Sequence, residues 1–212
     1  MELVDPRAMA YAEHYSTPPD ALLEEVADFT RHHQAGAHML SGAWQGKFLE
    51  MISLLQQPRR ILELGTFTGY SALCLAKGLA PDGLLHTIEL READARQARA
   101  FFDRSPWGKQ IILHTGPALE VLPGLQETWD LVFLDADKTG YVEYFDLVWP
   151  RLRKHGMILA DNVLFHGQVL EPVVRGKSAR GIQAFNEMIR RRTDLDKVLL
   201  PVRDGLFLIR KP

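Results

Sequence analysis

The sequence contains a single cysteine, Cys74, within an apolar stretch. One cysteine forms no disulfide inside the chain, so a disulfide-stapled secreted scaffold is excluded and a buried, inert thiol is expected. No run approaches the roughly eighteen apolar residues of a membrane-spanning helix, and the N-terminus lacks the apolar core of a signal peptide. A cytoplasmic protein without a membrane segment is therefore expected.

Net charge is also nearly absent. The chain has 25 Lys and Arg against 27 Asp and Glu, which gives a formal net charge of −2. This balance provides no overall attraction to nucleic acid or to an anionic membrane. With 212 residues, of which 46% are hydrophobic and 25% charged, the chain is expected to fold as a single globular domain, 1–212.

The glycine spacing of dinucleotide-binding proteins is missing as well. Residues 60–64 are a short apolar run typical of a buried parallel strand, and Gly65 and Gly69 follow it before an apolar helix begins. Their spacing is Glu-x-Gly-x-x-x-Gly, and not the Gly-x-Gly-x-x-Gly that holds a pyrophosphate. Glu63 would repel a pyrophosphate and favours a ligand with positive charge, such as S-adenosylmethionine. An ordinary strand–helix turn is the alternative interpretation.

Strands and helices alternate from residue 60 onward. The pattern predicts strands at 60–64, 84–90, 111–114, 130–135 and 157–161, with helices at 70–80, 92–103, 118–125, 140–154 and 182–192 and a loop at 163–181. Two final apolar runs flank Asp204-Gly205, which is a strong hairpin signal. Residues 1–40 are expected to be helical, 39–46 to be looser, and 48–55 to form a helix.

This alternation predicts an α/β protein with a doubly wound sheet. The sheet is expected to have seven mostly parallel strands, a reversed strand in a C-terminal hairpin, and helices on both faces. That arrangement is the Rossmann-like fold of class I methyltransferases. Because ligands of such sheets bind at the carboxyl ends of the strands, the residues that end each strand are the candidate site.

Acidic side chains end four of the five expected parallel strands. They are Glu63, Glu89, Asp135 and Asp161. Carboxylates that converge on one crevice repel one another unless a cation is bound among them. Glu89 lies twenty residues beyond Gly69, an offset at which an acid binds ribose hydroxyls in nucleotide-binding folds, although capping of the next helix is the alternative.

Asp135, Asp161 and Asn162 supply hard oxygen atoms at neighbouring strand ends. Such a set suits Mg²⁺ and not zinc, which prefers histidine and cysteine; a simple turn at 161–162 is the alternative. Lys138 follows Asp135 by three residues, and its pKa should fall beside a divalent cation, which would make it a base. A surface lysine at a helix start is the other interpretation of Lys138.

Five segments together resemble the cation-dependent O-methyltransferases, the family of the caffeoyl-CoA and catechol enzymes and their small bacterial relatives. They are Glu-Leu-Gly-Thr-Phe-Thr-Gly-Tyr-Ser at 63–71, Gly-Pro-Ala at 116–118, Phe-Leu-Asp-Ala-Asp-Lys at 133–138, Asp-Asn at 161–162 and Leu-Pro-Val-Arg-Asp-Gly at 200–205. The resemblance implies S-adenosylmethionine as methyl donor, a divalent cation, expected to be Mg²⁺, and a homodimer. It also implies an N-terminal helical segment on the acceptor side, 1–57, and a cofactor-binding core, 58–212.

The resemblance also implies the roles of individual residues. Lys138 corresponds to the catalytic base, and Asp135, Asp161 and Asn162 to the metal ligands. Lys138, Asn162 and His166 are expected to border the acceptor, with an exposed surface loop as the alternative interpretation of His166. The expected cofactor-binding residues are Ser41, Glu63, Gly65, Thr66, Ser71, Glu89, Ala118, Asp135 and Asp137.

The expected reaction is methylation of one hydroxyl of a catechol-like aromatic, a vicinal diol that can chelate the cation. Val-Leu-Phe-His at 163–166 departs from the Trp-Asn of plant caffeoyl-CoA enzymes, which argues against a coenzyme A ester. One alternative is the tRNA hydroxyuridine methyltransferases of the same family, for which basic residues at 175–180 could bind phosphate. A non-catalytic nucleotide-binding module is the other alternative. The expected metal ligands argue against it, because binding the cofactor alone requires none of them.

Overall fold

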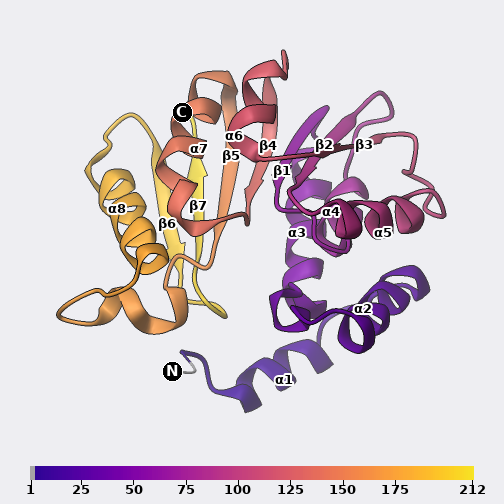
Figure 1. The fold of residues 1–212 in the computed structure, drawn as a ribbon, viewed down its shortest axis with the longest axis horizontal. Helices are drawn as coiled ribbons and strands as arrows, with labels where there is room; N and C mark the ends of the chain where they lie inside the picture. Colours follow the sequence, from indigo (N-terminus) through magenta and orange to yellow (C-terminus); the bar gives the residue numbers. More distant parts are fainter. Residues whose placement is uncertain (1–2) are drawn as a thin grey trace.

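Short apolar runs form the strands of one seven-stranded sheet in the computed structural model, which describes residues 3–212. The strands are β1 (Arg60–Leu64), β2 (Leu84–Glu89), β3 (Ile111–Thr115), β4 (Trp129–Leu134), β5 (Leu152–Asp161), β6 (Asp196–Leu200) and β7 (Leu206–Arg210). Their order is β3-β2-β1-β4-β5-β7-β6, and only β7 runs against its neighbours (Figure 1). The predicted fold class is confirmed.

Helices cover both faces of this sheet (Figure 1). They are α1 (Pro6–His14), α2 (Ala21–His33), α3 (Gly42–Gln56), α4 (Tyr70–Ala76), α5 (Glu92–Phe102), α6 (Ala118–Val121), α7 (Tyr141–Val148) and α8 (Lys177–Arg191). Successive strand residues point to opposite faces. Ile61 therefore packs with α2 to α5, and Leu62 and Leu64 pack with α6 to α8.

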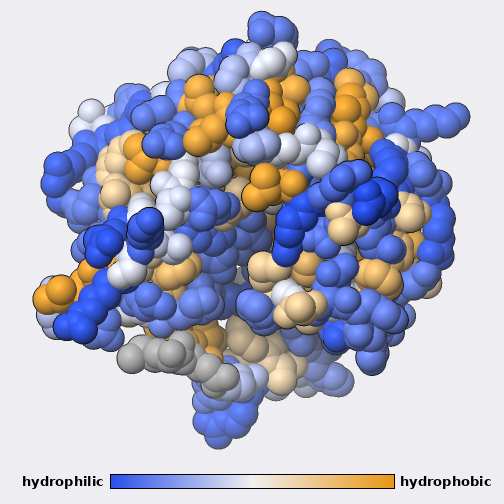
Figure 2. Space-filling model, viewed as in Figure 1, coloured by the Kyte–Doolittle hydropathy of each residue, from blue (hydrophilic) through white to orange (hydrophobic). Residues whose placement is uncertain are grey.

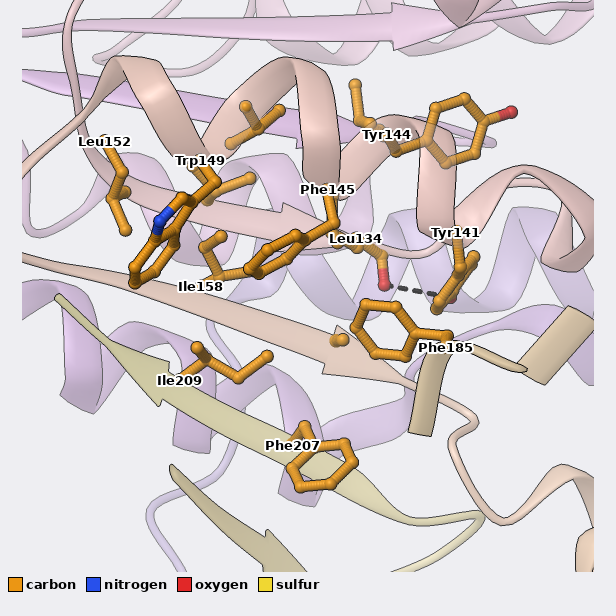
Figure 3. Packing of buried hydrophobic residues seen from close by; sticks show 14 of the residues in the cluster. Leu134, Tyr141, Tyr144, Phe145, Trp149, Leu152, Ile158, Phe185, Phe207 and Ile209 are labelled. Carbon is orange, nitrogen blue, oxygen red and sulfur yellow. Dashed lines mark hydrogen bonds between the residues drawn. The ribbon is translucent and has the colours of Figure 1, made fainter. Parts of the chain in front are cut away.

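Aromatic side chains fill the space between the sheet and helices α6 to α8. Phe145 and Trp149 stack at 5.2 Å between ring centroids, and Phe185 of α8 meets Phe145 edge-on. Figure 3 shows this cluster against Phe207 of β7. Burying each large apolar side chain contributes about 1.5–3 kcal/mol, which fixes β4, β5 and β7 relative to α7 and α8.

Several predicted boundaries are wrong. The helix predicted at 140–154 is an α-helix only to Val148, followed by a 3-10 turn at Trp149–Arg151, and 152–154 lie inside β5. Pairing of Leu152 with Trp129 of β4, followed by a shift of register, draws these residues into the sheet. α3 starts at Gly42 and α8 at Lys177, so the segments at 39–46 and 163–181 contain less loop than predicted.

The single-domain prediction includes Met1 and Glu2, which lie outside the described residues. Within residues 3–212, no helix combines the length and apolar character that crossing a membrane requires. Figure 2 shows mainly hydrophilic residues on one face of the molecule, with small apolar patches between them. Cys74 is buried in α4, where burial raises the pKa of its thiol, in agreement with an inert cysteine.

Two histidines form a partly buried pair on β2 and β3. His86 Nδ1 lies 3.1 Å from His114 Nε2, the rings stack, and Trp129 packs against His86 edge-on. Burial lowers the pKa of His86, and the neighbouring His114 lowers it further; burial also lowers the pKa of His114. The native state therefore favours the neutral pair.

Lowering the pH from about 7.5 to about 5.5 is expected to destabilise the protein through this pair. A histidine in the unfolded chain takes up its proton near pH ~6.5, and the native pair does so only at lower pH. This contribution is present above pH ~6.5 and is lost as the pH falls through the native pKa values. Urea unfolding of the wild type and of His114→Gln at both pH values measures it. The variant should lose less unfolding free energy; an equal loss in both proteins would contradict the prediction.

Candidate active site

The loop after β1 brings the ends of three strands together. Gly65 has φ +96°, and its N–H donates to Ile88 O of β2 at 3.0 Å. A Cβ at this position would overlap the carbonyl oxygen of Asp135, which follows β4. The Phe67 N–H donates to Glu89 Oε2 at 2.7 Å. Only glycine combines this φ with such a close backbone approach, which explains the first glycine of the motif.

The carboxyl ends of β1, β2, β4 and β5 open into a cavity of about 520 Å³, a volume in the range of small-molecule sites. It is lined by nearly all the residues predicted for the site: Ser41, Gly65, Thr66, Ser71, Glu89, Ala118, Asp135, Asp137, Lys138, Asp161, Asn162 and His166. The predicted Glu63 is fully buried and does not line it. The structure therefore brings together residues that are far apart in the sequence.

Glu63 is a buried carboxyl group with one unused oxygen. The Thr87 hydroxyl donates to Glu63 Oε2 at 2.5 Å, whereas Oε1 has no hydrogen-bond partner among residues 3–212. Burial raises the pKa of Glu63 to about 8; the nearby Ser71 and Thr87 hydroxyls oppose this rise, and the negative charges of Asp135 and Glu89 add to it. An orphaned carboxyl oxygen of this kind fits a cationic or hydrogen-bond-donating ligand.

Asp135 and Asp161 lie side by side because they follow paired residues, Leu134 and Ala160, of neighbouring parallel strands. Burial raises the pKa of Asp135 to about 6, the Lys138 ammonium opposes this rise, and the charge of Asp161 adds to it. Asn162, with φ +56°, follows directly and also lines the cavity. Two crowded carboxylates and an amide oxygen are ligands that Mg²⁺ accepts.

The described part of the chain contains no group of three His, Cys, Asp or Glu side chains placed to hold a metal ion. The predicted set is compatible with that finding because its third member, Asn162, is an amide. Mg²⁺ commonly uses only one or two carboxylates and takes its other ligands from water and substrate. The residues present therefore fit a magnesium-type site better than a zinc-type site.

Lys138 lies beside these carboxylates. Its Nζ is 2.7 Å from Asp135 Oδ1 and 2.9 Å from the hydroxyl of Tyr141. That hydroxyl lies 3.0 Å from the carbonyl oxygens of Leu134, drawn in Figure 3, and of Asp161. Burial alone would lower the pKa of Lys138, but Asp135 and Tyr141 hold it above its usual value. The sequence predicts a fall in the pKa of Lys138 beside a bound cation. In this structure the ion pair with Asp135 instead keeps the pKa of Lys138 high.

Sequence reasoning missed several polar groups of the site. Gln45, buried in α3, donates to Asp161 Oδ2, and Arg203 and Asp204, from the turn between β6 and β7, bond to Gln45 and Asn162. Arg203 and Asp204 stand in the segment 200–205, which the sequence indicates as a hairpin turn and as a family motif without assigning either residue a role. The sequence held no clear signal for Gln45, because the buried face of α3 also carries Glu50 and Ser53.

A sheet with this strand order, one reversed strand and a cavity over its acidic strand ends defines the class I methyltransferases. The O-methyltransferase family model matches residues 13–212, and the chain belongs to that family. It is an S-adenosylmethionine-dependent O-methyltransferase by fold and family.

Individual relatives agree with this assignment. Catechol O-methyltransferase of Niastella koreensis is 38% identical over 74% of this chain and 72% of its own length. Caffeoyl-CoA O-methyltransferase of Petroselinum crispum is 30% identical over 93% of this chain and 86% of its own length. The O-methyltransferase TomG of Streptomyces achromogenes, whose structure was determined in complex with SAM, superposes with a TM-score of 0.87 at 32% identity, over 95% of this chain and 94% of TomG.

Proposed function

We propose that this protein methylates one hydroxyl of a vicinal dihydroxy aromatic in a reaction that requires a divalent cation, with Mg²⁺ as the expected ion. The observation that carries the proposal is the group formed by Asp135, Asp161, Asn162 and Lys138 on the cavity wall. Cofactor binding alone would not need two carboxylates, an amide and a lysine at one place. The relatives named for catechol and caffeoyl-CoA substrates support a hydroxylated aromatic acceptor.

The cofactor would bind along the ends of β1, β2 and β4. Glu89 lies at the end of β2, with Oε2 bonded to the Phe67 N–H and Oε1 to the Arg91 N–H, an arrangement that holds its carboxylate in place for ribose hydroxyls. Glu63, beneath the glycine loop, fits the cationic amino-acid end of S-adenosylmethionine. Ser41, Thr66, Ser71, Ala118 and Asp137 line the same cavity.

The acceptor would bind where Lys138, Asn162 and His166 meet the cavity. A divalent cation held by Asp135, Asp161 and Asn162 would supply Lewis acidity toward two neighbouring acceptor oxygens. Lys138 Nζ would take the proton of the hydroxyl to be methylated. Lys138 lines the cavity beside the proposed metal ligands, with Nζ 2.7 Å from Asp135 Oδ1. To accept this proton Lys138 must be a neutral amine, a form that a cation sharing the charge of Asp135 would favour. The chain's main contribution is to hold the reactants in line, which can supply about 7–11 kcal/mol.

Two isomeric acceptors test the proposal. Caffeic acid carries its hydroxyls on adjacent carbons, and 3,5-dihydroxycinnamic acid has the same groups but cannot chelate one cation through both oxygens. Release of S-adenosylhomocysteine with Mg²⁺ present should be at least about 100-fold faster with caffeic acid, because only the adjacent pair uses the metal as a template. Equal rates with both isomers, or turnover of tRNA alone, would contradict the proposed acceptor.

A further inference from the structure

A glutamine on α3 links the N-terminal segment to one of the proposed metal ligands. Gln45 is only 3% exposed, and its Nε2 donates to Asp161 Oδ2 at 2.7 Å. Its Oε1 accepts from Arg203 Nη1, also at 2.7 Å. An arginine can only donate and a carboxylate can only accept, so the two partners fix which way the Gln45 amide points. The amide therefore holds Asp161 by one oxygen, Oδ2.

Arg203 is itself held in the turn between β6 and β7. Its Nη2 donates to the carbonyl oxygen of Leu40 at 3.2 Å, and its backbone has φ +48°. The guanidinium thus bonds to the residue that holds Asp161 and to the chain just before α3. A hairpin turn from the far end of the sequence and the start of α3 meet at this point.

Asp204 holds Asn162, the second of the two proposed metal ligands on β5 and the loop after it. Asn162 Nδ2 donates to Asp204 Oδ2 at 3.3 Å, and the N–H of His166 donates to Asp204 Oδ1. Because a carboxylate can only accept, the Asn162 amide must turn its nitrogen to Asp204, which leaves Oδ1 for other partners. The backbone repeats the connection, since the Leu164 N–H donates to the Asp204 carbonyl oxygen at 2.9 Å. The turn therefore fixes the chain where it leaves β5.

We propose that Gln45, Arg203 and Asp204 are positioning residues that orient Asp161 and Asn162 for a divalent cation. Each ligand is held by one side-chain atom, Asp161 by Oδ2 and Asn162 by Nδ2, so the remaining oxygen of each is free to coordinate. This inference rests on the proposed metal site and adds to it the groups that shape it. Partners that orient metal ligands in this way typically change metal affinity by about 10–100-fold when they are removed.

A merely structural role would give a different result. If the three residues only fastened the hairpin to α3, their loss would lower the melting temperature and leave cation affinity unchanged. If they orient the ligands, cation affinity falls even in a fully folded variant. Cation affinity, measured directly and without turnover, therefore separates the two roles.

The test is Mn²⁺ binding to the full chain, followed by electron paramagnetic resonance, in the wild type and in Gln45→Met. Methionine keeps the length of the side chain and removes both hydrogen bonds. The matched control is Gln56→Met, at the other end of α3, where Gln56 Nε2 donates to the Asp130 carbonyl oxygen at 2.6 Å. The Mn²⁺ dissociation constant should rise about 10–100-fold in Gln45→Met and stay within about twofold in the control.

Wild-type affinity in folded Gln45→Met overturns the inference and leaves the metal site intact. Absence of Mn²⁺ binding to the wild type overturns the metal site and this inference with it, and is recognised before any variant is measured. Should Gln45→Met not fold, Arg203→Met replaces it; this variant removes the bond that orients the Gln45 amide and the bond to the Leu40 carbonyl oxygen, and it keeps the Gln45 side chain. Weaker Mn²⁺ binding in that variant supports the proposal, and unchanged binding overturns it.

Discussion

Replacing Lys138 by methionine is expected to lower turnover by about 10²–10⁴, the usual contribution of a positioned proton acceptor. The loss should appear in kcat at saturating cation and acceptor, because Lys138 is the basic group next to the proposed metal ligands. Calorimetric binding of S-adenosylhomocysteine should change little, since the expected cofactor contacts come from other residues. Turnover and cofactor affinity measured on the same preparation give the two numbers.

Lys177→Met is the matched control, because Lys177 is exposed at the start of α8. It removes the same positive charge from a side chain that does not line the cavity and should leave turnover unchanged. Full turnover of Lys138→Met at neutral pH would show that another group, or water, accepts the proton. The assignment of Lys138 as the base would then be wrong.

Replacing Gly65 by alanine is the second change with a large expected effect. The residue has φ +96°, and the added Cβ would overlap the carbonyl oxygen of Asp135. A left-handed backbone costs a residue with a Cβ about 1–2 kcal/mol, and overpacking adds about 1–3 kcal/mol. Urea unfolding should show a loss of about 2–5 kcal/mol, together with weaker cofactor binding as the loop moves away from β4.

Gly124→Ala provides the comparison for this change. A Cβ on Gly124 meets no atom within 4 Å, and its φ is not in the left-handed region, so the variant should be as stable as the wild type. If Gly65→Ala were equally stable and bound the cofactor normally, the close approach between Gly65 and Asp135 would not hold in solution.

Much of the fold could be predicted because strand and turn signals are local. Residues 60–64 are β1 with the predicted bounds, and Asp204-Gly205 does form the turn of a hairpin. The helix predicted at 140–154 forms but ends early, because pairing between β4 and β5 draws the residues from Leu152 onward into the sheet. The apolar run before the hairpin turn forms β6, which ends at Leu200, since Pro201 has no N–H to donate to a neighbouring strand.

The candidate site, like the fold, could be predicted from the sequence only in part. Asp135 and Asp161 could be placed together because parallel strands end at one edge of a sheet. The bond from Gln45 to Asp161 joins residues 116 positions apart and depends on how α3 packs. No periodicity or spacing indicates such a partner. The functions of Arg203 and Asp204 likewise depend on where the turn lies relative to α3 and β5, which only the folded chain determines.

The dependence of turnover on a divalent cation tests the central claim most directly. The measurement is release of S-adenosylhomocysteine with caffeic acid, first with Mg²⁺, then with EDTA, then with excess Mg²⁺ restored, in the wild type and in Asp161→Ala. We expect turnover that EDTA abolishes and Mg²⁺ restores, and almost none in Asp161→Ala at any cation concentration. Turnover that persists in EDTA, or in Asp161→Ala, would contradict the role given to Asp135, Asp161 and Asn162.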